Sequence, residues 1–112
     1  IKIPYLTKND RRLDPNGKRN PTDVWYFDRV NNMTKKKLGL SDVPTMFPTP
    51  MIERIVKMSS NKGDVILDPF AGSGTVAVAS NNLGRKSISI EIDNRYEDII
   101  SKRIKNEFES KI

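Results

Sequence analysis

The chain has 112 residues, of which 36% are hydrophobic, and a formal net charge of +6. These values allow one small domain and favour a polyanionic partner such as nucleic acid. It contains no cysteine and no histidine, which excludes a disulfide framework, a thiolate or imidazole metal site and a histidine general base. No apolar run is long enough to span a bilayer and no signal peptide is recognisable, so we expect a cytoplasmic protein without a membrane partner.

Residues 1–23 are polar and basic. Turn residues at 14–17 and the lack of periodicity predict neither a helix nor a long strand in residues 1–23, which are interpreted as a solvated loop or as a segment lying along a phosphate backbone. The aromatic run 24–27 has strand character and is expected to pack in the core or at a subunit contact. Residues 29–42, which include Lys35, Lys36 and Lys37, predict a mobile basic loop.

Order returns after Pro48. Thr49 is predicted to cap a helix and Pro50 to occupy its first position. Apolar residues then recur at helical spacing, so one face of this helix is expected to be buried until the Asn-Lys-Gly sequence at 61–63 ends it. That face comprises Met51, Ile52, Ile55, Val56 and Ser59.

The stretch 63–91 predicts a strand, a glycine loop, a helix and a second strand. The apolar run 65–67 stops at Asp68, as a buried parallel strand does at its carboxyl end. Gly72 and Gly74 permit positive φ angles, and the helix that follows, ending by Gly84, directs its first amides at an anionic group above the strand ends. The second strand alternates isoleucine with serine and places Glu91 at its end, where a carboxylate can accept hydrogen bonds from a ribose diol.

A last helix is predicted from residues 93–94, with Asn94 as its cap and Glu97 bonding back to it. One stripe of this helix is apolar and is interpreted as core. It consists of Tyr96, Ile99, Ile100 and Ile104, whereas Glu97, Asp98, Lys102 and Arg103 are expected on the solvent side.

Two cofactor classes fit the 63–91 stretch. Gly72, Gly74 and Ala77 satisfy the dinucleotide pattern GxGxxG/A, and Glu91 follows Gly72 at a spacing of nineteen (91 − 72), near the value expected for a nicotinamide dinucleotide. The whole string from Asp68 to Thr75, Asp-Pro-Phe-Ala-Gly-Ser-Gly-Thr, closely resembles the S-adenosylmethionine-binding motif of the DNA amino-methyltransferases that modify adenine N6 or cytosine N4.

This resemblance covers residues 18–106. Asp-Val-Trp at 23–25 resembles the segment that follows the target-recognition region, and Val43 to Pro48 aligns with the family's His-Pro-Thr-Gln-Lys-Pro, of which Pro44, Thr45 and Pro48 are kept. The order of segments is similar to the beta class. The family's catalytic string, Asp/Ser/Asn-Pro-Pro followed by an aromatic residue, does not occur, and Lys-Ile-Pro-Tyr at 2–5 is the nearest match.

The resemblance implies an α/β, Rossmann-like S-adenosylmethionine-dependent methyltransferase fold, of which this chain contains part of the parallel sheet with flanking helices. Residues 1–43 would end the target-recognition region and residues 44–112 would form the cofactor-binding region. The catalytic half is expected upstream, so no catalytic residue and no metal ligand is assigned in this chain.

The implied reaction is direct methyl transfer to the exocyclic amine of a flipped-out base, with adenine N6 favoured over cytosine N4. The expected partners are double-stranded DNA, the upstream catalytic half and a second copy in a homodimer. The alternatives are a nicotinamide-dependent oxidoreductase domain and a non-catalytic nucleic-acid-binding module. The implied cofactor-binding residues are Thr45, Asp68, Phe70, Ala71, Gly72, Ser73, Gly74, Thr75, Glu91 and Ile92.

Overall fold

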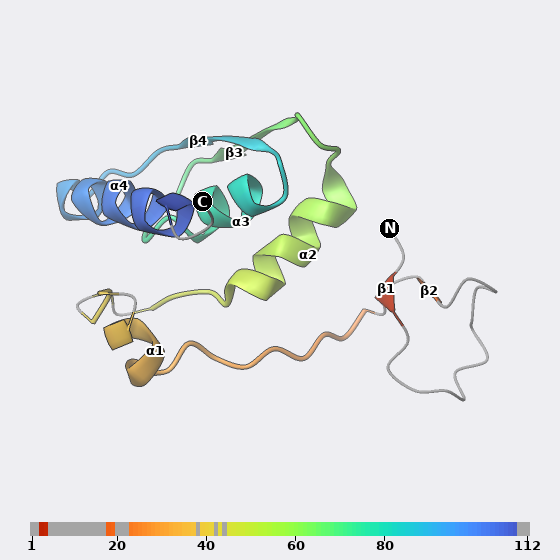
Figure 1. Ribbon diagram of the computed structural model, residues 1–112, viewed down its shortest axis with the longest axis horizontal. Coiled ribbons are helices and arrows are strands. Elements are labelled where there is room, and N and C mark those ends of the chain that lie inside the picture. Colours follow the sequence, from red (N-terminus) through yellow and green to blue (C-terminus); the bar gives the residue numbers. More distant parts are fainter. Residues whose placement is uncertain are drawn as a thin grey trace.

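The computed structural model describes residues 3–4, 18–19, 23–37, 39–41, 43 and 45–109. Two short strands near the amino end pair with each other, and the elements from residue 49 onward form an α/β unit (Figure 1). In chain order the elements are β1 (Ile3–Pro4), β2 (Lys18–Arg19), α1 (Asn32–Lys37), α2 (Thr49–Ser59), β3 (Val65–Asp68), α3 (Thr75–Asn82), β4 (Lys86–Ser89) and α4 (Asn94–Glu109).

Strands β3 and β4 are parallel neighbours, with Val65 opposite Lys86 and Asp68 opposite Ser89, and α3 connects them. The Ile90 N–H donates to the Asp68 carbonyl oxygen over 2.9 Å, so main-chain pairing continues past the end of β4. This arrangement confirms the βαβ unit predicted for residues 63–91. The second strand ends at Ser89, however, two residues before Glu91, which therefore lies just beyond the sheet.

Helix α3 lies at the centre of the α/β unit and contacts both strands, α2 and α4. Its small residues allow this close approach, and Ala79 is fully buried against Ile52 and Val56 of α2. Met51, Ile66, Val76 and Leu83 complete the cluster. Ile55 and Ser59, which were predicted on the same face of α2, are exposed, so the buried face is narrower than the sequence pattern indicates. None of the described helices is both long and apolar enough to cross a membrane.

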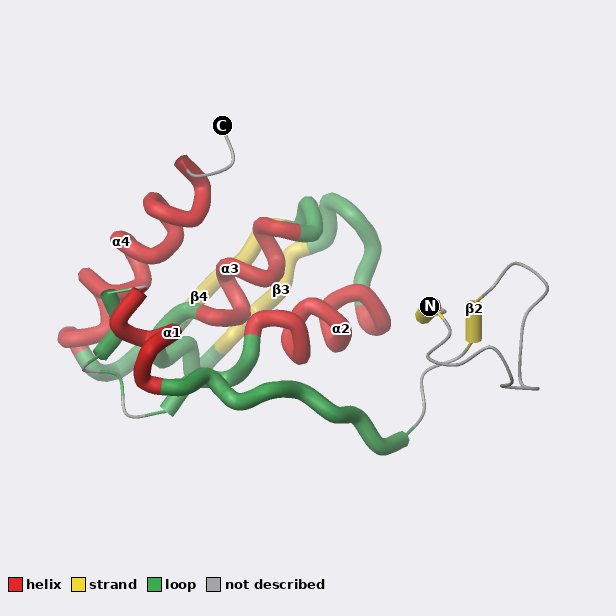
Figure 2. Tube along the Cα trace, turned by 60° about the horizontal axis from the view of Figure 1, so that its bottom comes forward, coloured by secondary structure: helices red, strands yellow, loops and turns green. Residues whose placement is uncertain are grey.

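The described elements cover only one face of the β3–β4 sheet. Helices α2, α3 and α4 lie below the two strands in Figure 1, and in the turned view of Figure 2 α3 lies in front of the strands, between α4 and α2. On the opposite face Leu67 is 61% exposed and its partner Ile88 is 54% exposed, and Val65 and Ile90 are exposed beside them. Strand β3 is therefore exposed on this second face, because no described element of this chain packs there.

The two predicted helix caps differ from those observed. Pro48 occupies the cap position of α2, Thr49 begins the helix, and the cap makes no side-chain hydrogen bond. At α4 the cap is Asp93 rather than Asn94, since Asp93 Oδ1 accepts the Arg95 N–H over 3.0 Å. An aspartate one residue before the first helical residue can reach this amide, and Asn94, already helical, cannot.

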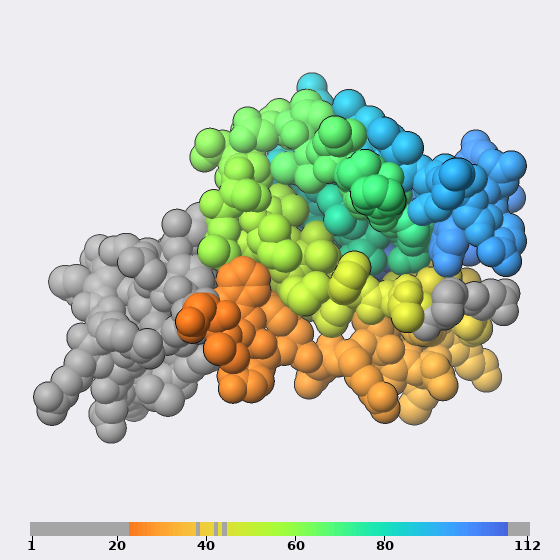
Figure 3. Space-filling model, turned by 180° about the vertical axis from the view of Figure 1, so that it is seen from behind, coloured from red at the N-terminus to blue at the C-terminus, as the bar shows by residue number. Residues whose placement is uncertain are grey.

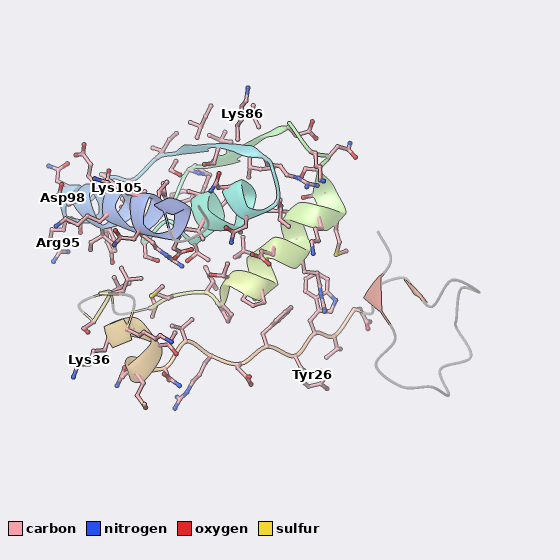
Figure 4. The ribbon with its side chains drawn as sticks, viewed as in Figure 1. Tyr26, Lys36, Lys86, Arg95, Asp98 and Lys105 are labelled. Carbon is pink, nitrogen blue, oxygen red and sulfur yellow. The ribbon has the colours of Figure 1, made fainter. Side chains whose placement is uncertain are left out.

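The segment 23–30 crosses α2 as extended chain without forming a strand, so the strand predicted at 24–27 is wrong. Its contact with α2 is a stack of aromatic rings on a cation, in which the Arg54 guanidinium carbon lies 5.3 Å from the Trp25 ring centre and 4.9 Å from that of Phe27. The two rings meet edge to face at 6.4 Å. In the view from behind, this orange segment lies against the yellow-green α2 (Figure 3), whereas Tyr26 points away from the helix (Figure 4).

Residues 29–42 contain a helical turn and a half, α1, where the sequence predicts a mobile loop. Lys35 explains the difference, because its buried Nζ donates to the Val43 carbonyl oxygen over 2.9 Å and so joins α1 to the segment that follows it. Lys36 and Lys37 remain exposed, and Lys36 points outward from α1 (Figure 4).

Candidate functional site

The candidate site is the segment 68–75 at the carboxyl end of the parallel strands, which runs from the last residue of β3 through the connecting loop to the first residue of α3. Asp68 Oδ1 accepts the Phe70 N–H over 3.1 Å, which turns the chain out of the strand. The Ala71 N–H donates to the Ile90 carbonyl oxygen and the Gly74 N–H to that of Ala71, both over 2.9 Å. Gly72 and Gly74 have φ angles of 53° and 83°, as the sequence predicts for this loop.

Glu91 is attached to this loop. Its Oε2 accepts the Gly72 N–H over 2.7 Å, and its Oε1 accepts the Asp93 N–H over 3.0 Å. The half-buried carboxylate therefore joins the glycine loop to the start of α4. The structure thus brings Glu91 and the loop together, the juxtaposition that the sequence predicts for a nucleoside-binding half.

Asp93, which follows Glu91 closely, carries an ion pair of its own. Arg95 Nη2 donates to Asp93 Oδ2 over 2.6 Å, and Arg95 Nε donates to both carboxylate oxygens at 3.0 Å. The side-chain hydrogen bond from Arg95, aided by its backbone N–H, holds the pKa of Asp93 below its usual range. The same pair raises the pKa of Arg95. Asp93 thus stays ionised and keeps its role as the cap of α4.

The other face of the loop contacts α4. A Cβ at Gly74 would lie 3.2 Å from two side-chain carbons of Ile100. On this face the Arg103 guanidinium bonds to three residues. Its Nη1 donates to Thr75 Oγ1 over 2.9 Å and to the Ser73 carbonyl oxygen over 3.2 Å. Its Nη2 donates to Thr49 Oγ1 over 3.4 Å. The prediction that Arg103 faces solvent is wrong.

A sequence signal for Arg103 does exist. It lies three residues after Ile100 and seven after Tyr96, and residues at these spacings share one helix face. The apolar stripe therefore already indicated burial at position 103. Arg103 was predicted to face solvent because it is charged. Serine and threonine hydroxyls in the loop, however, provide the acceptors that a buried guanidinium needs.

Of the remaining predicted residues, Phe70 and Ile92 adjoin this cluster in sequence with exposed side chains, and Thr45 lies elsewhere. Ile92 is 97% exposed and Phe70 is also exposed. Thr45 lines a cavity of about 410 Å³ together with Arg29, Lys35 and Met46. Glu91 lines a different cavity, of about 290 Å³, with Ser89, Asp93, Asn94 and Ile100 among its walls. The structure does not bring Thr45 into the cavity of Glu91. Within the described residues, no three acidic side chains gather closely enough to hold a metal ion.

Comparison with known proteins identifies the family. The family model N6_N4_Mtase, described as DNA methylase, matches residues 1–102. The chain belongs to the DNA methylase family. This assignment confirms the resemblance inferred from the 68–75 string.

Relatives of this DNA methylase chain include Type II methyltransferase M.ScaI of Streptomyces caespitosus, 41% identical over 112 residues, which cover 98% of this chain and 36% of the relative. DNA adenine methyltransferase YhdJ of Escherichia coli K12 is 44% identical over 94 residues, covering 78% of this chain and 30% of the relative. The chain thus spans about a third of the length of these curated relatives.

Solved structures support the fold assignment. The complex of M1.HpyAVI with SAM is 31% identical and aligns with a TM-score of 0.59, covering 77% of this chain and 42% of the other. TTHA0409 of Thermus thermophilus, complexed with S-adenosyl-L-methionine, is 30% identical with a TM-score of 0.54, covering 80% of this chain and 42% of the other. The DNA methylase chain therefore has the α/β fold of these methyltransferase structures, as predicted.

The packing of the loop on α4 gives a first testable prediction. Gly74→Ala combines a left-handed φ with a clash against Ile100, so we expect the free energy of unfolding to fall by about 2–4 kcal/mol. Gly39→Ala is the matched control, because Gly39 has a φ of 72° but a Cβ there meets nothing within 4 Å; its loss should be about 1 kcal/mol. Urea unfolding followed by circular dichroism measures both. Equal losses would show that Ile100 yields to the new methyl group.

Proposed function

We propose that this chain is the S-adenosyl-L-methionine-binding part of a DNA methyltransferase that methylates an exocyclic base amine, with adenine N6 favoured. The observation that carries the proposal is the bond between Glu91 and the Gly72 amide, which holds an acceptor carboxylate next to a glycine loop at the carboxyl end of parallel strands. In α/β sheets, ligands bind at that end. The adenine preference is supported by the relative YhdJ, a DNA adenine methyltransferase.

The residues present fit this cofactor. An ionised carboxylate has about four acceptor positions, and Glu91 uses two of them for backbone N–H groups, so acceptor capacity remains for ribose hydroxyls. A Cβ built on Gly72 meets nothing within 4 Å, so the space in front of the loop is open. Exposed Ile92 provides an apolar surface next to Glu91 for a purine ring.

The bound cofactor supplies the methyl group, and the residues of this chain bind and orient it. Glu91 accepts hydrogen bonds from the ribose. The first-turn amides of α3, which have no intrahelical acceptor, face the carboxylate at the amino-acid end of the cofactor. Asp68, whose carboxylate turns the loop out of β3, favours a cationic amine or sulfonium electrostatically. Alignment of the base amine requires the family's Pro-Pro string, which does not occur among these 112 residues.

Calorimetric titration of the chain with S-adenosylhomocysteine, NAD and duplex DNA tests the proposal. We expect saturable binding of S-adenosylhomocysteine and no binding of NAD. Binding of NAD alone would favour the oxidoreductase alternative, whereas binding of DNA without either nucleoside ligand would favour a nucleic-acid-binding module. Either result would overturn the assignment.

DNA contact is proposed for the exposed basic residues of α1. Lys36 and Lys37 are the relevant pair, because the Lys35 ammonium is buried against the Val43 carbonyl. Changing both to glutamine should lower affinity for all duplex sequences equally and reduce the slope of log affinity against log salt by about 2, as expected for two lost phosphate contacts. The measurement is fluorescence anisotropy with labelled duplexes at several salt concentrations.

The matched control for this experiment is the double change of Lys57 and Lys62 to glutamine, two exposed lysines near the carboxyl end of α2. It removes the same charge and should leave the salt slope unchanged. An equal reduction in both double variants would mean that net charge, rather than the α1 surface, sets the affinity.

A further inference from the structure

Arg103 is a buried cation in the middle of α4. Its side chain is 3% exposed, and its acidic partner, Glu107, receives a bond from Nε over 3.1 Å and is 27% exposed. Burying a charge is costly unless it is paired and hydrogen-bonded. The lysines at positions 102 and 105 of the same helix are exposed, whereas Arg103 is buried. This difference indicates a specific structural requirement for the guanidinium.

The contacts of Arg103 converge on one place. Nη1 donates to Thr75 Oγ1 over 2.9 Å. It also donates to the Ser73 carbonyl oxygen over 3.2 Å and to the Ser73 hydroxyl over 3.4 Å. Ser73 and Thr75 flank Gly74 and are themselves buried. The bond from Nη2 to Thr49, at 3.4 Å, adds a weaker link to the first residue of α2. The guanidinium therefore joins the glycine loop to two helices.

The loop is consequently held from two sides. Glu91 accepts the Gly72 N–H on one side, and Arg103 donates to the next turn of the chain on the other. Two glycines with positive φ would leave this segment conformationally free in isolation. Fixing it before a ligand arrives removes an ordering cost from binding.

We propose that Arg103 is a positioning residue that fixes the glycine loop, through Ser73 and Thr75, in the conformation that receives the carboxylate end of the cofactor. This inference rests on the proposed function and adds a residue that acts on the loop rather than on the ligand. It predicts that loss of the guanidinium weakens ligands that reach the loop with a carboxylate and spares those that do not.

The test compares two ligands in the full chain. S-adenosylhomocysteine carries the amino-acid end, and 5′-methylthioadenosine has the same nucleoside without it. Arg103→Met keeps the aliphatic stem and removes the donors. We expect its Kd for S-adenosylhomocysteine to rise about tenfold or more, because binding must then order the freed loop, with the Kd for 5′-methylthioadenosine unchanged. Lys102→Met, on the exposed face of the same helix, should change neither value.

Arg103→Lys keeps the charge but not the planar set of donors, and it should give an intermediate rise for S-adenosylhomocysteine. If circular dichroism shows that Arg103→Met does not fold, the two ligands are compared with Arg103→Lys instead. Equal weakening of both ligands, or no change in either, would overturn the positioning role while wild-type binding upholds the proposed function. Failure of the wild-type chain to bind either ligand would overturn both proposals.

Discussion

Replacing Glu91 with glutamine is expected to weaken S-adenosylhomocysteine binding by about 1–3 kcal/mol, the scale of charge-assisted hydrogen bonds. Both carboxylate oxygens accept backbone N–H groups, from Gly72 and Asp93. A glutamine side chain has one oxygen, and its NH₂ group would face an N–H donor instead of accepting from it. The change therefore removes an acceptor for the ribose and also loosens the loop.

Asp98→Asn is the matched control, because Asp98 is an exposed carboxylate on α4 outside the Glu91 cavity (Figure 4). It should leave the affinity unchanged. Calorimetry gives the affinities, and urea unfolding of the unliganded variants separates loss of loop stability from loss of ligand contact. An unaltered affinity in Glu91→Gln would remove Glu91 from the site.

These 112 residues by themselves are expected to transfer no methyl group to DNA. The described residues position a cofactor, but the chain lacks the Pro-Pro string that would align an exocyclic amine, and alignment is worth several orders of magnitude in rate. Adding a polypeptide that carries the family's catalytic string should restore transfer. The assay follows radiolabelled methyl groups from S-adenosyl-L-methionine into duplex DNA, with the chain alone and with that polypeptide.

Co-purification of the same two polypeptides measures their association. Leu67 and Ile88 lie on an open sheet face, and a catalytic polypeptide that covers it should bury this apolar surface. Leu67→Lys should therefore prevent co-purification, whereas exposed Ile55→Lys on α2 should not. Methyl transfer by the isolated chain would show that its own residues align the base amine.

Local signals in the sequence predict most of the α/β unit. The apolar run 65–67, the two glycines and the alternating isoleucines act over a few residues, and the observed β3, α3 and β4 follow them. The pairing of Glu91 with the loop is also predictable, because the carboxyl ends of adjacent parallel strands meet at one edge. In each case the feature depends on backbone conformation, which short-range sequence patterns predict well.

The features that the sequence did not predict depend on contacts between distant residues. Burial of Arg103 requires acceptors on residues 28 and 54 positions away, and a helical pattern that sorts residues by polarity places a cation in solvent. The order in α1 likewise depends on the Lys35 ammonium reaching Val43. The aromatic run 24–27 has high strand propensity, but its rings pack on Arg54 of α2, and this contact overrides the propensity.

The stack on Arg54 has a spectroscopic consequence. Trp25 is the only tryptophan of the chain, and its half-buried indole lies against a guanidinium rather than in the α3 core. Indole emission therefore reports whether the segment 23–30 is docked on α2, while the far-ultraviolet signal of the helices reports the α/β unit. If the segment detaches first on heating, the two melting curves will separate, and the fluorescence midpoint will measure the strength of one surface contact.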